Sequence, residues 1–306
     1  MAKVNGEHEV LVFGHRGASG YRPENTLEAF ALAFELGSDA IECDLLPTAD
    51  GELIIRHDNY LSTTTDVAEH PEFAHLKRMG VVGWQEERED WFCEDFTLAQ
   101  LKTLRAVERL PELRPGSAKF DGQFELPTVD DLLTADFAAG KHLILEVKHG
   151  GYFAAKGMPV AAILARKLNE IDWRSRGISL TLEAFEFKVL EQLQRVCGQI
   201  GDYVYLVDTW SDPELNAKAA EIFDGISFNA ELVWGSDLIE VAHARGQKVF
   251  IWTARAEEAE NTIEEYYAKF ILSGADGIFA DQPDLLAACV RDRSKGCPRI
   301  TWLCQN

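Results

Sequence analysis

The sequence predicts an α/β protein with the (β/α)8 fold of a TIM barrel, carrying one inserted segment on the barrel rim. Short apolar runs rich in β-branched residues alternate with amphipathic stretches along most of the 306 residues, which is typical of β-α units around a parallel sheet. About eight such runs occur, the number at which a parallel sheet closes into a barrel. With 46% hydrophobic and 26% charged residues, the chain can bury a sizeable core, and we expect a single domain over residues 1–306.

The expected strands follow one another along the chain with room for a helix after most of them. They are Val10–Gly14, Ala40–Leu46, Leu143–Lys148, Ile178–Phe185, Tyr203–Val207, Gly225–Phe228, Lys248–Thr253 and Gly277–Ala280. In a barrel of this kind the residues at the carboxyl ends of the strands face the active site.

The first helix has recognisable start and stop signals. We expect Asn25 to be its N-cap, Glu28 to complete a capping box, and Gly37 to end it in a left-handed conformation. One face of this helix would then carry four apolar residues, Leu27, Phe30, Ala31 and Phe34. Two later helices are marked in the same way: one opens at Pro127-Thr128, and the other covers 236–245 and ends at Gly246.

One long segment lacks the β/α alternation. Residues 59–123 mix glycine, proline and charged residues with the aromatic side chains of Trp84, Trp91, Phe92 and Phe96. A loop of this length is usually functional or folded in its own right. We therefore interpret 59–123 as a packed cap inserted between the second and third expected strands.

The strand ends carry the residues that can do chemistry. His15 and Arg16 follow the first strand, where they could transfer a proton and hold a phosphate. In the second strand Glu42 and Asp44 are two residues apart, so both carboxylates point to the same side. Two acids on the inward face repel each other unless a cation joins them, and the apolar residues around them disfavour a solvent-facing strand.

Two more groups arrive near the same place. A turn at 48–51 returns the chain as a hairpin strand that ends at His57, and the next strand carries Glu146 and Lys148 on one face. A third carboxylate and a fixed cation suit a metal ion with an anionic phosphate. Each pair alone could equally be a structural ion pair, and a lone histidine could be a packed core residue. Their joint appearance at strand ends favours a catalytic site.

At this point the sequence resembles the glycerophosphodiester phosphodiesterase family from about residue 10 to residue 285. The motifs that carry the resemblance stand in the family's order: His15-Arg16-Gly17, Pro23-Glu24-Asn25-Thr26, Glu42-x-Asp44, Thr48-x-Asp50-Gly51, His57-Asp58, Glu146-x-Lys148, Trp252-Thr253 and Asp276-Gly277-Ile278 with Asp281-x-Pro283. The stretches at 66–69 and 95–98 resemble the long insertion of bacterial members that act on glycerophosphodiesters.

The resemblance implies roles for individual residues. Glu42, Asp44 and Glu146 would bind one divalent cation, and His15 and His57 would be the general base and acid. Arg16 and Lys148 would hold the phosphate oxygens. Trp252 would flank the glycerol or head group, although core packing is an equal alternative for that residue.

The implied reaction is hydrolysis of a glycerophosphodiester to glycerol 3-phosphate and an alcohol. Because all expected ligands are hard oxygens, Mg²⁺ or Ca²⁺ is favoured over zinc. The alternatives are a phospholipase D-like relative acting on lysophospholipids and an inert barrel kept for binding. A metal-dependent amidohydrolase is disfavoured, because its first strand would carry a His-x-His pair where Arg16-Gly17 follows His15.

The net charge and the cysteines limit the kinds of partner and compartment that we expect. The formal net charge of −21 repels nucleic acid and anionic membranes, so we expect a small-molecule substrate, no nucleic acid and no stable membrane insertion. The six cysteines form no C-x-x-C pair, which indicates a reduced compartment. No apolar leader precedes the first strand, so we expect a cytoplasmic protein, or a periplasmic one if a signal peptide has been trimmed. The oligomeric state is not predicted.

Overall fold

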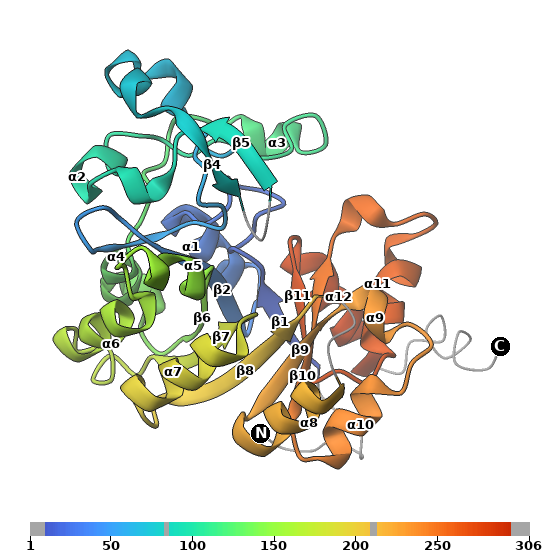
Figure 1. Cartoon of the computed structure of the whole chain (residues 1–306). Helices are drawn as coiled ribbons and strands as arrows, with labels where there is room; N and C mark the ends of the chain where they lie inside the picture. Colours follow the sequence, from blue (N-terminus) through green and yellow to red (C-terminus); the bar gives the residue numbers. More distant parts are fainter. Residues whose placement is uncertain (1–9, 83–85, 209–212, 295–306) are drawn as a thin grey trace.

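The computed structural model describes residues 10–82, 86–208 and 213–294, and within them eight parallel strands close into a barrel (Figure 1). Around the barrel the strands follow the order β1-β11-β10-β9-β8-β7-β6-β2, and β1 pairs with β2 to close the ring. The TIM-barrel prediction is thus confirmed. The bounds of the barrel strands are β1 Leu11–Gly14, β2 Ala40–Pro47, β6 His142–Val147, β7 Ser179–Ala184, β8 Gly201–Val207, β9 Gly225–Asn229, β10 Lys248–Ala254 and β11 Gly277–Ala280.

The helices lie around the outside of this sheet (Figure 1). Their bounds are α1 Leu27–Glu35, α4 Val129–Thr134, α5 Gly150–Ala155, α6 Val160–Glu170, α7 Phe187–Cys197, α8 Pro213–Ile222, α9 Ala230–Val233, α10 Leu238–Ala244, α11 Ile263–Ile271 and α12 Pro283–Ser294. Among the helices that the structure describes, none combines the length and the apolar character needed to cross a bilayer.

Inside the barrel, a layer of apolar side chains lies next to the layer of polar residues expected at the site, because side chains two residues apart on a strand point to the same side. Phe13, Ile144 and Phe250 form a buried cluster with neighbouring strands, and the ring of Phe13 meets that of Phe250 edge-on at 5.0 Å. Each lies two residues before a polar or aromatic residue expected at the site, so both layers point to the same side of their strands. The aromatic layer closes the barrel next to the site and gives the polar residues a rigid support.

The start of α1 differs from the prediction. Its N-cap is Thr26, whose hydroxyl accepts a hydrogen bond from the backbone N–H of Ala29, and no capping box forms with the exposed Glu28. Asn25 instead adopts a left-handed conformation (φ 58°) and donates its side-chain amide to Asp44 Oδ2 at 2.8 Å. The predicted N-cap is wrong because asparagine tolerates the left-handed region, which frees its side chain for the barrel interior.

The shift of the cap also moves the buried face of α1. Ala29, Phe30 and Ala33 are its buried residues, whereas Leu27, Ala31 and Phe34 are only partly buried. The end is as predicted, since Gly37 has a φ of +98°. The other two predicted helices are present as α4, which begins after Thr128 with a capping box, and α10, which ends before the left-handed Gly246.

The inserted segment lies on one end of the molecule, between β3 (Leu53–Ile55), which pairs antiparallel to β2, and β6 (Figure 1). It contains a two-stranded sheet, short helices and 3₁₀ turns, with bounds β4 Arg78–Val82, β5 Glu86–Asp90, α2 Leu98–Leu101, α3 Pro115–Ala118 and 3₁₀ turns at Val67–Glu69, Pro71–Leu76 and Cys93–Asp95. Trp91, Phe92 and Phe96 are buried, as a packed segment requires. Trp84 lies outside the described residues.

Candidate active site

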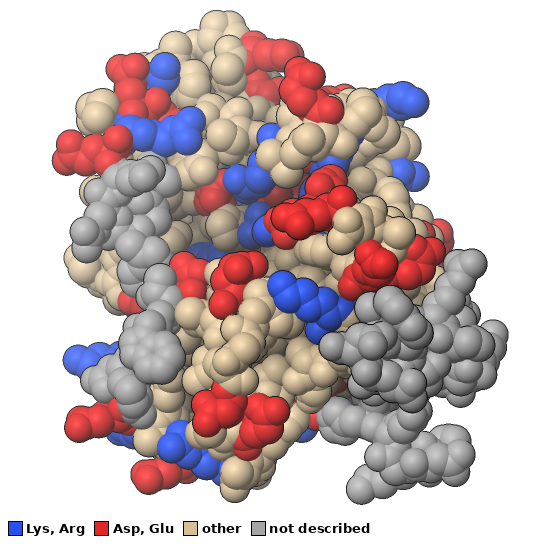
Figure 2. Space-filling view, turned by 90° about the vertical axis from the view of Figure 1, so that its right-hand side faces the viewer, with Lys and Arg blue, Asp and Glu red and all other residues tan. Residues whose placement is uncertain are grey.

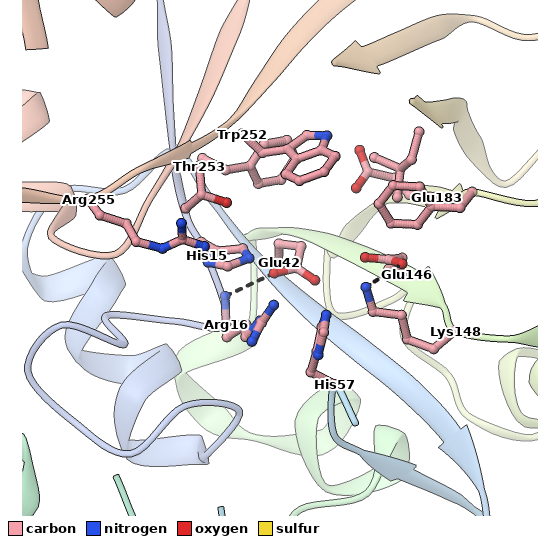
Figure 3. Close-up of a pocket in the computed structure, with 13 residues that line it drawn as sticks. His15, Arg16, Glu42, His57, Glu146, Lys148, Glu183, Trp252, Thr253 and Arg255 are labelled. Carbon is pink, nitrogen blue, oxygen red and sulfur yellow. Dashed lines mark hydrogen bonds and ion pairs between the residues drawn. The ribbon is translucent and has the colours of Figure 1, made fainter. Parts of the chain in front are cut away.

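One pocket at the carboxyl ends of the strands collects seven of the eight residues that the sequence singled out. They are His15, Arg16, Glu42, His57, Glu146, Lys148 and Trp252. Figure 3 shows Trp252 on one side of the pocket and His57 on the opposite side, with Glu42 and Glu146 between them. The eighth residue, Asp44, is almost fully buried beside the same carboxylates.

Three carboxylates from two adjacent strands form the acidic centre of the pocket. Asp44 of β2 lies opposite Glu146 of β6 in the parallel register, and Glu42 lies two residues earlier on the same face of β2. One oxygen from each of the three carboxylates lies within 4.8 Å of the others, and all three residues are buried. Glu42 Oε1 has no hydrogen-bond partner in the described part of the chain.

Burial and mutual repulsion set the ionisation of these acids. Burial, with the charges of Asp44 and Glu146, raises the pKa of Glu42 well above its ordinary value. Burial likewise raises the pKa of Glu146 to about 7. Burial would also raise the pKa of Asp44, but the neighbouring Lys148 and Arg16 outweigh it and hold that pKa below its usual range. When all three carboxylates are ionised, their negative charge exceeds the positive charge of the two neighbouring cations, Arg16 and Lys148.

Two cations face the acids. Lys148 Nζ lies 2.8 Å from Glu146 Oε1 and 3.3 Å from Asp44 Oδ1. Arg16 Nε lies 3.4 Å from Asp44 Oδ2, and the backbone N–H of Arg16 donates to Glu42 Oε2 at 2.9 Å. Arg16 has a φ of 55°, a left-handed backbone that is rare for side chains other than glycine and asparagine. Such strained residues cluster at functional sites, where the surrounding structure holds them.

Each histidine rests against an aspartate. His15 Nδ1 lies 2.6 Å from Asp281 Oδ1, and His57 Nδ1 lies 2.6 Å from Asp58 Oδ1. Because an ionised carboxylate only accepts hydrogen bonds, each aspartate places the proton of a neutral ring on Nδ1 and leaves Nε2 free to accept another. Burial and the nearby charge of Arg16 lower the pKa of both rings, that of His57 the more strongly.

Residues 15–285 match the model of the glycerophosphoryl diester phosphodiesterase family. The chain belongs to this family. The matched range contains the whole pocket, from His15 to Phe279, and the carboxylate of Asp281.

Individual relatives differ in how much of their length aligns. A glycerophosphodiester phosphodiesterase of Caldanaerobacter subterraneus subsp. tengcongensis is 27% identical over 92% of this chain and 98% of its own. The Arabidopsis thaliana protein GDPD6 is 42% identical over 39% of this chain and 31% of its own, and one from Haemophilus influenzae is 28% identical over 63% and 54%. The chain thus aligns with about a third to a half of these last two relatives.

Solved structures of family members share the fold. A Silicibacter pomeroyi glycerophosphoryl diester phosphodiesterase superposes with a TM-score of 0.72 at 23% identity, covering 93% of this chain and 94% of that one. An Oleispira antarctica phosphodiesterase, solved with the product sn-glycerol-3-phosphate, has a TM-score of 0.68 at 22% identity and covers 92% and 96%.

In this family member, several residues around the pocket were not singled out from the sequence. Glu183 on β7 is buried, lies opposite Glu146 in the register, and burial raises its pKa well above the ordinary value. Phe185 and Arg255 also line the pocket. The alternation of Thr181 and Glu183 in an otherwise apolar strand is the one sequence signal that points to this fourth acid.

Trp252 lines the pocket and also packs against the aromatic layer that contains Phe13 and Phe250. Its side chain is partly exposed, and its ring meets that of Phe185 edge-on at 5.5 Å between centroids. The indole N–H of Trp252 and the hydroxyl of Thr253 have no hydrogen-bond partner within the described residues. An apolar wall with two unsatisfied polar groups suits the side of a small polar ligand.

Proposed function

We propose that this chain hydrolyses glycerophosphodiesters to glycerol 3-phosphate and an alcohol, with one divalent cation, Mg²⁺ or Ca²⁺, held by Glu42, Asp44 and Glu146. The observation that carries the proposal is the convergence of three buried carboxylates, two cations and two aspartate-backed histidines on one pocket. The product bound to the Oleispira antarctica phosphodiesterase and the activity named for the aligned relatives support it.

The acidic centre fits a hard divalent cation. All its donors are carboxylate oxygens, which Mg²⁺ and Ca²⁺ prefer, and Glu42 Oε1 is a buried acceptor for which the described residues offer no hydrogen-bond partner. A cation would also offset the repulsion that raises the pKa of Glu42 and Glu146. When bound, it would supply Lewis-acid polarisation of a phosphoryl oxygen.

The two basic side chains hold the substrate phosphate in this proposal. Arg16 presents a planar guanidinium suited to two phosphate oxygens, and Lys148 adds a compact charge on the opposite side of the carboxylates. Lys148 is buried and Arg16 is partly buried, and ion pairs hold both in place, so they are preorganised where negative charge builds up during displacement at phosphorus.

The two histidines exchange the protons. One ring takes the proton of the nucleophile, either water or the glycerol hydroxyl of the substrate, onto its free Nε2. The other ring, protonated, gives its proton to the leaving alkoxide. The aspartate behind each ring stays ionised and stabilises the imidazolium while it exists. Trp252 flanks the glycerol or head group, consistent with its place on the pocket wall.

The proposal is tested by measuring glycerol 3-phosphate release from a panel of glycerophosphodiesters. We expect activity to disappear after chelation with EDTA and to return with Mg²⁺ or Ca²⁺. A panel that includes lysophospholipids separates this activity from that of a phospholipase D-like relative. Full activity in a preparation shown to be metal-free would contradict the three-carboxylate site.

A further inference from the structure

The inserted segment reaches the active site through two arginines, and each arginine contacts the aspartate behind one histidine. Arg109 pairs with Asp58, the partner of His57, and Arg114 pairs with Asp281, the partner of His15. Within the described residues, neither arginine forms a hydrogen bond with a histidine. Arg114 is buried and Arg109 is partly buried, with side chains 5% and 23% exposed.

Arg114 and His15 contact different oxygens of the Asp281 carboxylate. Arg114 Nη2 donates to Asp281 Oδ2 at 2.5 Å, while His15 Nδ1 lies 2.6 Å from Oδ1. Arg114 is itself held by Glu257 and by the backbone carbonyl of Ser19, which follows the first strand. With one oxygen fixed by the guanidinium, Asp281 presents the other to His15 in a single direction.

The contact of Arg109 repeats this arrangement on the opposite side. Arg109 Nη1 lies 2.6 Å from Asp58 Oδ2, while Asp58 Oδ1 faces His57. The other two nitrogens of Arg109 bind both oxygens of Glu24 at 2.7 and 2.8 Å. Glu24 in turn accepts from Arg16 Nη1 at 3.1 Å. Arg109 therefore supports the aspartate behind His57 and, through Glu24, also Arg16, the expected phosphate-binding residue.

We propose that Arg109 and Arg114 are positioning residues, through which the inserted segment fixes the tautomer and ring orientation of both histidines. This inference rests on the proposed function above. The physical reason is that a guanidinium binds carboxylates in a fixed fork, so each aspartate loses the freedom to rotate away from its imidazole. The segment is then part of the active site, because without it Asp58 would lose the ion pair at its second oxygen, and Asp281 Oδ2 would keep only the longer contact from Arg255 Nε at 3.3 Å.

The arrangement differs from that of an ordinary ion pair of the same segment. Arg78 of β4 pairs with Asp95 at 2.6 Å and with the buried Glu94 at 3.4 Å, all inside the insertion and away from the pocket. Arg78→Ala is therefore the matched control. It removes an arginine and takes the ion pair from the partly buried Asp95, without touching either histidine, while Glu94 keeps its contacts with Lys156 and Tyr152.

The first test compares the kinetics of Arg109→Ala, Arg114→Ala and Arg78→Ala in the metal-loaded enzyme. We expect Arg114→Ala to lower kcat by about 10- to 100-fold with KM nearly unchanged, the scale on which small misplacements act. Arg109→Ala should lower kcat similarly and also raise KM, because it releases Glu24 from beside Arg16. Guanidinium ion at millimolar concentration should partly restore kcat in both variants and have no effect on the control.

The second test does not depend on activity. In wild-type protein, ¹⁵N NMR of the neutral imidazole rings should show both histidines as the Nδ1–H tautomer. Arg114→Ala should mix the tautomers of His15 alone, and Arg109→Ala those of His57 alone. Arg78→Ala should leave both spectra unchanged.

The outcomes separate this inference from the proposed function. A wild-type protein that releases no glycerol 3-phosphate contradicts the function, while the tautomer spectra still decide the positioning role. An active wild type whose two variants match Arg78→Ala in kcat and in spectra overturns the inference. If an alanine variant does not fold, Arg109→Lys and Arg114→Lys keep the charge. Wild-type kcat and spectra in these lysine variants would then show that charge alone suffices, which also overturns it.

Discussion

The two histidines lie in an environment that favours the neutral ring, and nearby acidic groups partly offset that preference. Burial and Arg16 lower the pKa of His15, while the ionised Asp281 raises it and so opposes the shift. His57 has the same balance between its cationic neighbours and the acids around it. A neutral ring with a free Nε2 suits a base, and the aspartate behind it suits the imidazolium that forms.

The first prediction concerns these rings. His15→Ala or His57→Ala should each lower kcat on a glycerophosphodiester by roughly 100- to 10,000-fold, the range of general acid-base catalysis. Metal content, measured by elemental analysis, should change little because neither ring is an expected ligand. The double variant should lose much less than the product of the single effects, since residues that act together are not additive.

The leaving group provides the control for this prediction. A substrate with a nitrophenol leaving group needs little protonation, so the variant lacking the acid should recover more activity on it than the variant lacking the base. This comparison assigns the two roles. Near wild-type turnover by both single variants on a natural glycerophosphodiester would refute the two-histidine mechanism.

A second prediction at this scale concerns the acidic centre. Burial raises the pKa of Glu42, which favours its protonated form when no cation is bound, and glutamine is a close mimic of that form. Glu42→Gln should therefore weaken Mg²⁺ or Ca²⁺ binding, measured by calorimetry, while the Tm of the metal-free protein changes little. Unfolding of the variant with unchanged cation affinity would reverse the assignment.

At the scale of elements, regular periodicity was readable from the sequence and local exceptions were not. Eight strands follow from apolar runs because a parallel sheet covered on its outer face needs them. The N-cap at Asn25 failed because its amide serves Asp44 instead, a contact between residues 19 positions apart. Likewise, no local sequence pattern marks Arg109 or Arg114. Arg109 lies 85 positions from its partner Glu24, and Arg114 lies 167 positions from its partner Asp281.

The corrected cap gives a third prediction. Thr26→Ala should lower the free energy of unfolding by about 1 kcal/mol, because it removes the side-chain acceptor at the start of α1. Urea unfolding followed by circular dichroism measures this change. Glu28→Ala is the control and should have almost no effect, since Glu28 is exposed and makes no capping bond. An equal loss in both variants would indicate that a capping box exists after all.

At the scale of the whole molecule, an acidic protein presents a basic hollow. The formal net charge is −21, yet Figure 2 shows lysine and arginine side chains gathered in a hollow of one face, with acidic side chains around it. The pocket itself carries Arg16, Lys148 and Arg255. A local reversal of this kind lets an anionic substrate enter a molecule that repels anions elsewhere.

Ion pairs between the inserted segment and the barrel make the stability of the folded protein dependent on pH. Burial would raise the pKa of Glu24, Asp58 and Asp281, but the paired arginines outweigh burial at Glu24 and Asp58, and His15 followed by Arg114 and Arg255 outweighs it at Asp281, so each pKa lies below its usual range. A carboxylate whose pKa is lower in the folded state contributes stability above its unfolded-state pKa, near 4, and that stability is lost as pH falls toward the folded-state pKa.

The last prediction follows from this loss of stability at low pH. Between pH 6 and pH 3 the free energy of unfolding, from urea titrations followed by tryptophan fluorescence, should fall by on the order of 1 kcal/mol for each of these carboxylates, because below about pH 4 the unfolded chain binds a proton that the folded chain does not. Glu42 and Glu146 act in the opposite direction in the metal-free protein, because their raised pKa makes protonation favour the folded state. The comparison with Arg114→Ala removes that common background. The variant should be less stable at pH 6 but show a shallower loss toward pH 3, since the pKa of Asp281 is no longer held as low. Parallel pH curves for the variant and the wild type would mean that the pairing between the insertion and the barrel contributes nothing to acid sensitivity.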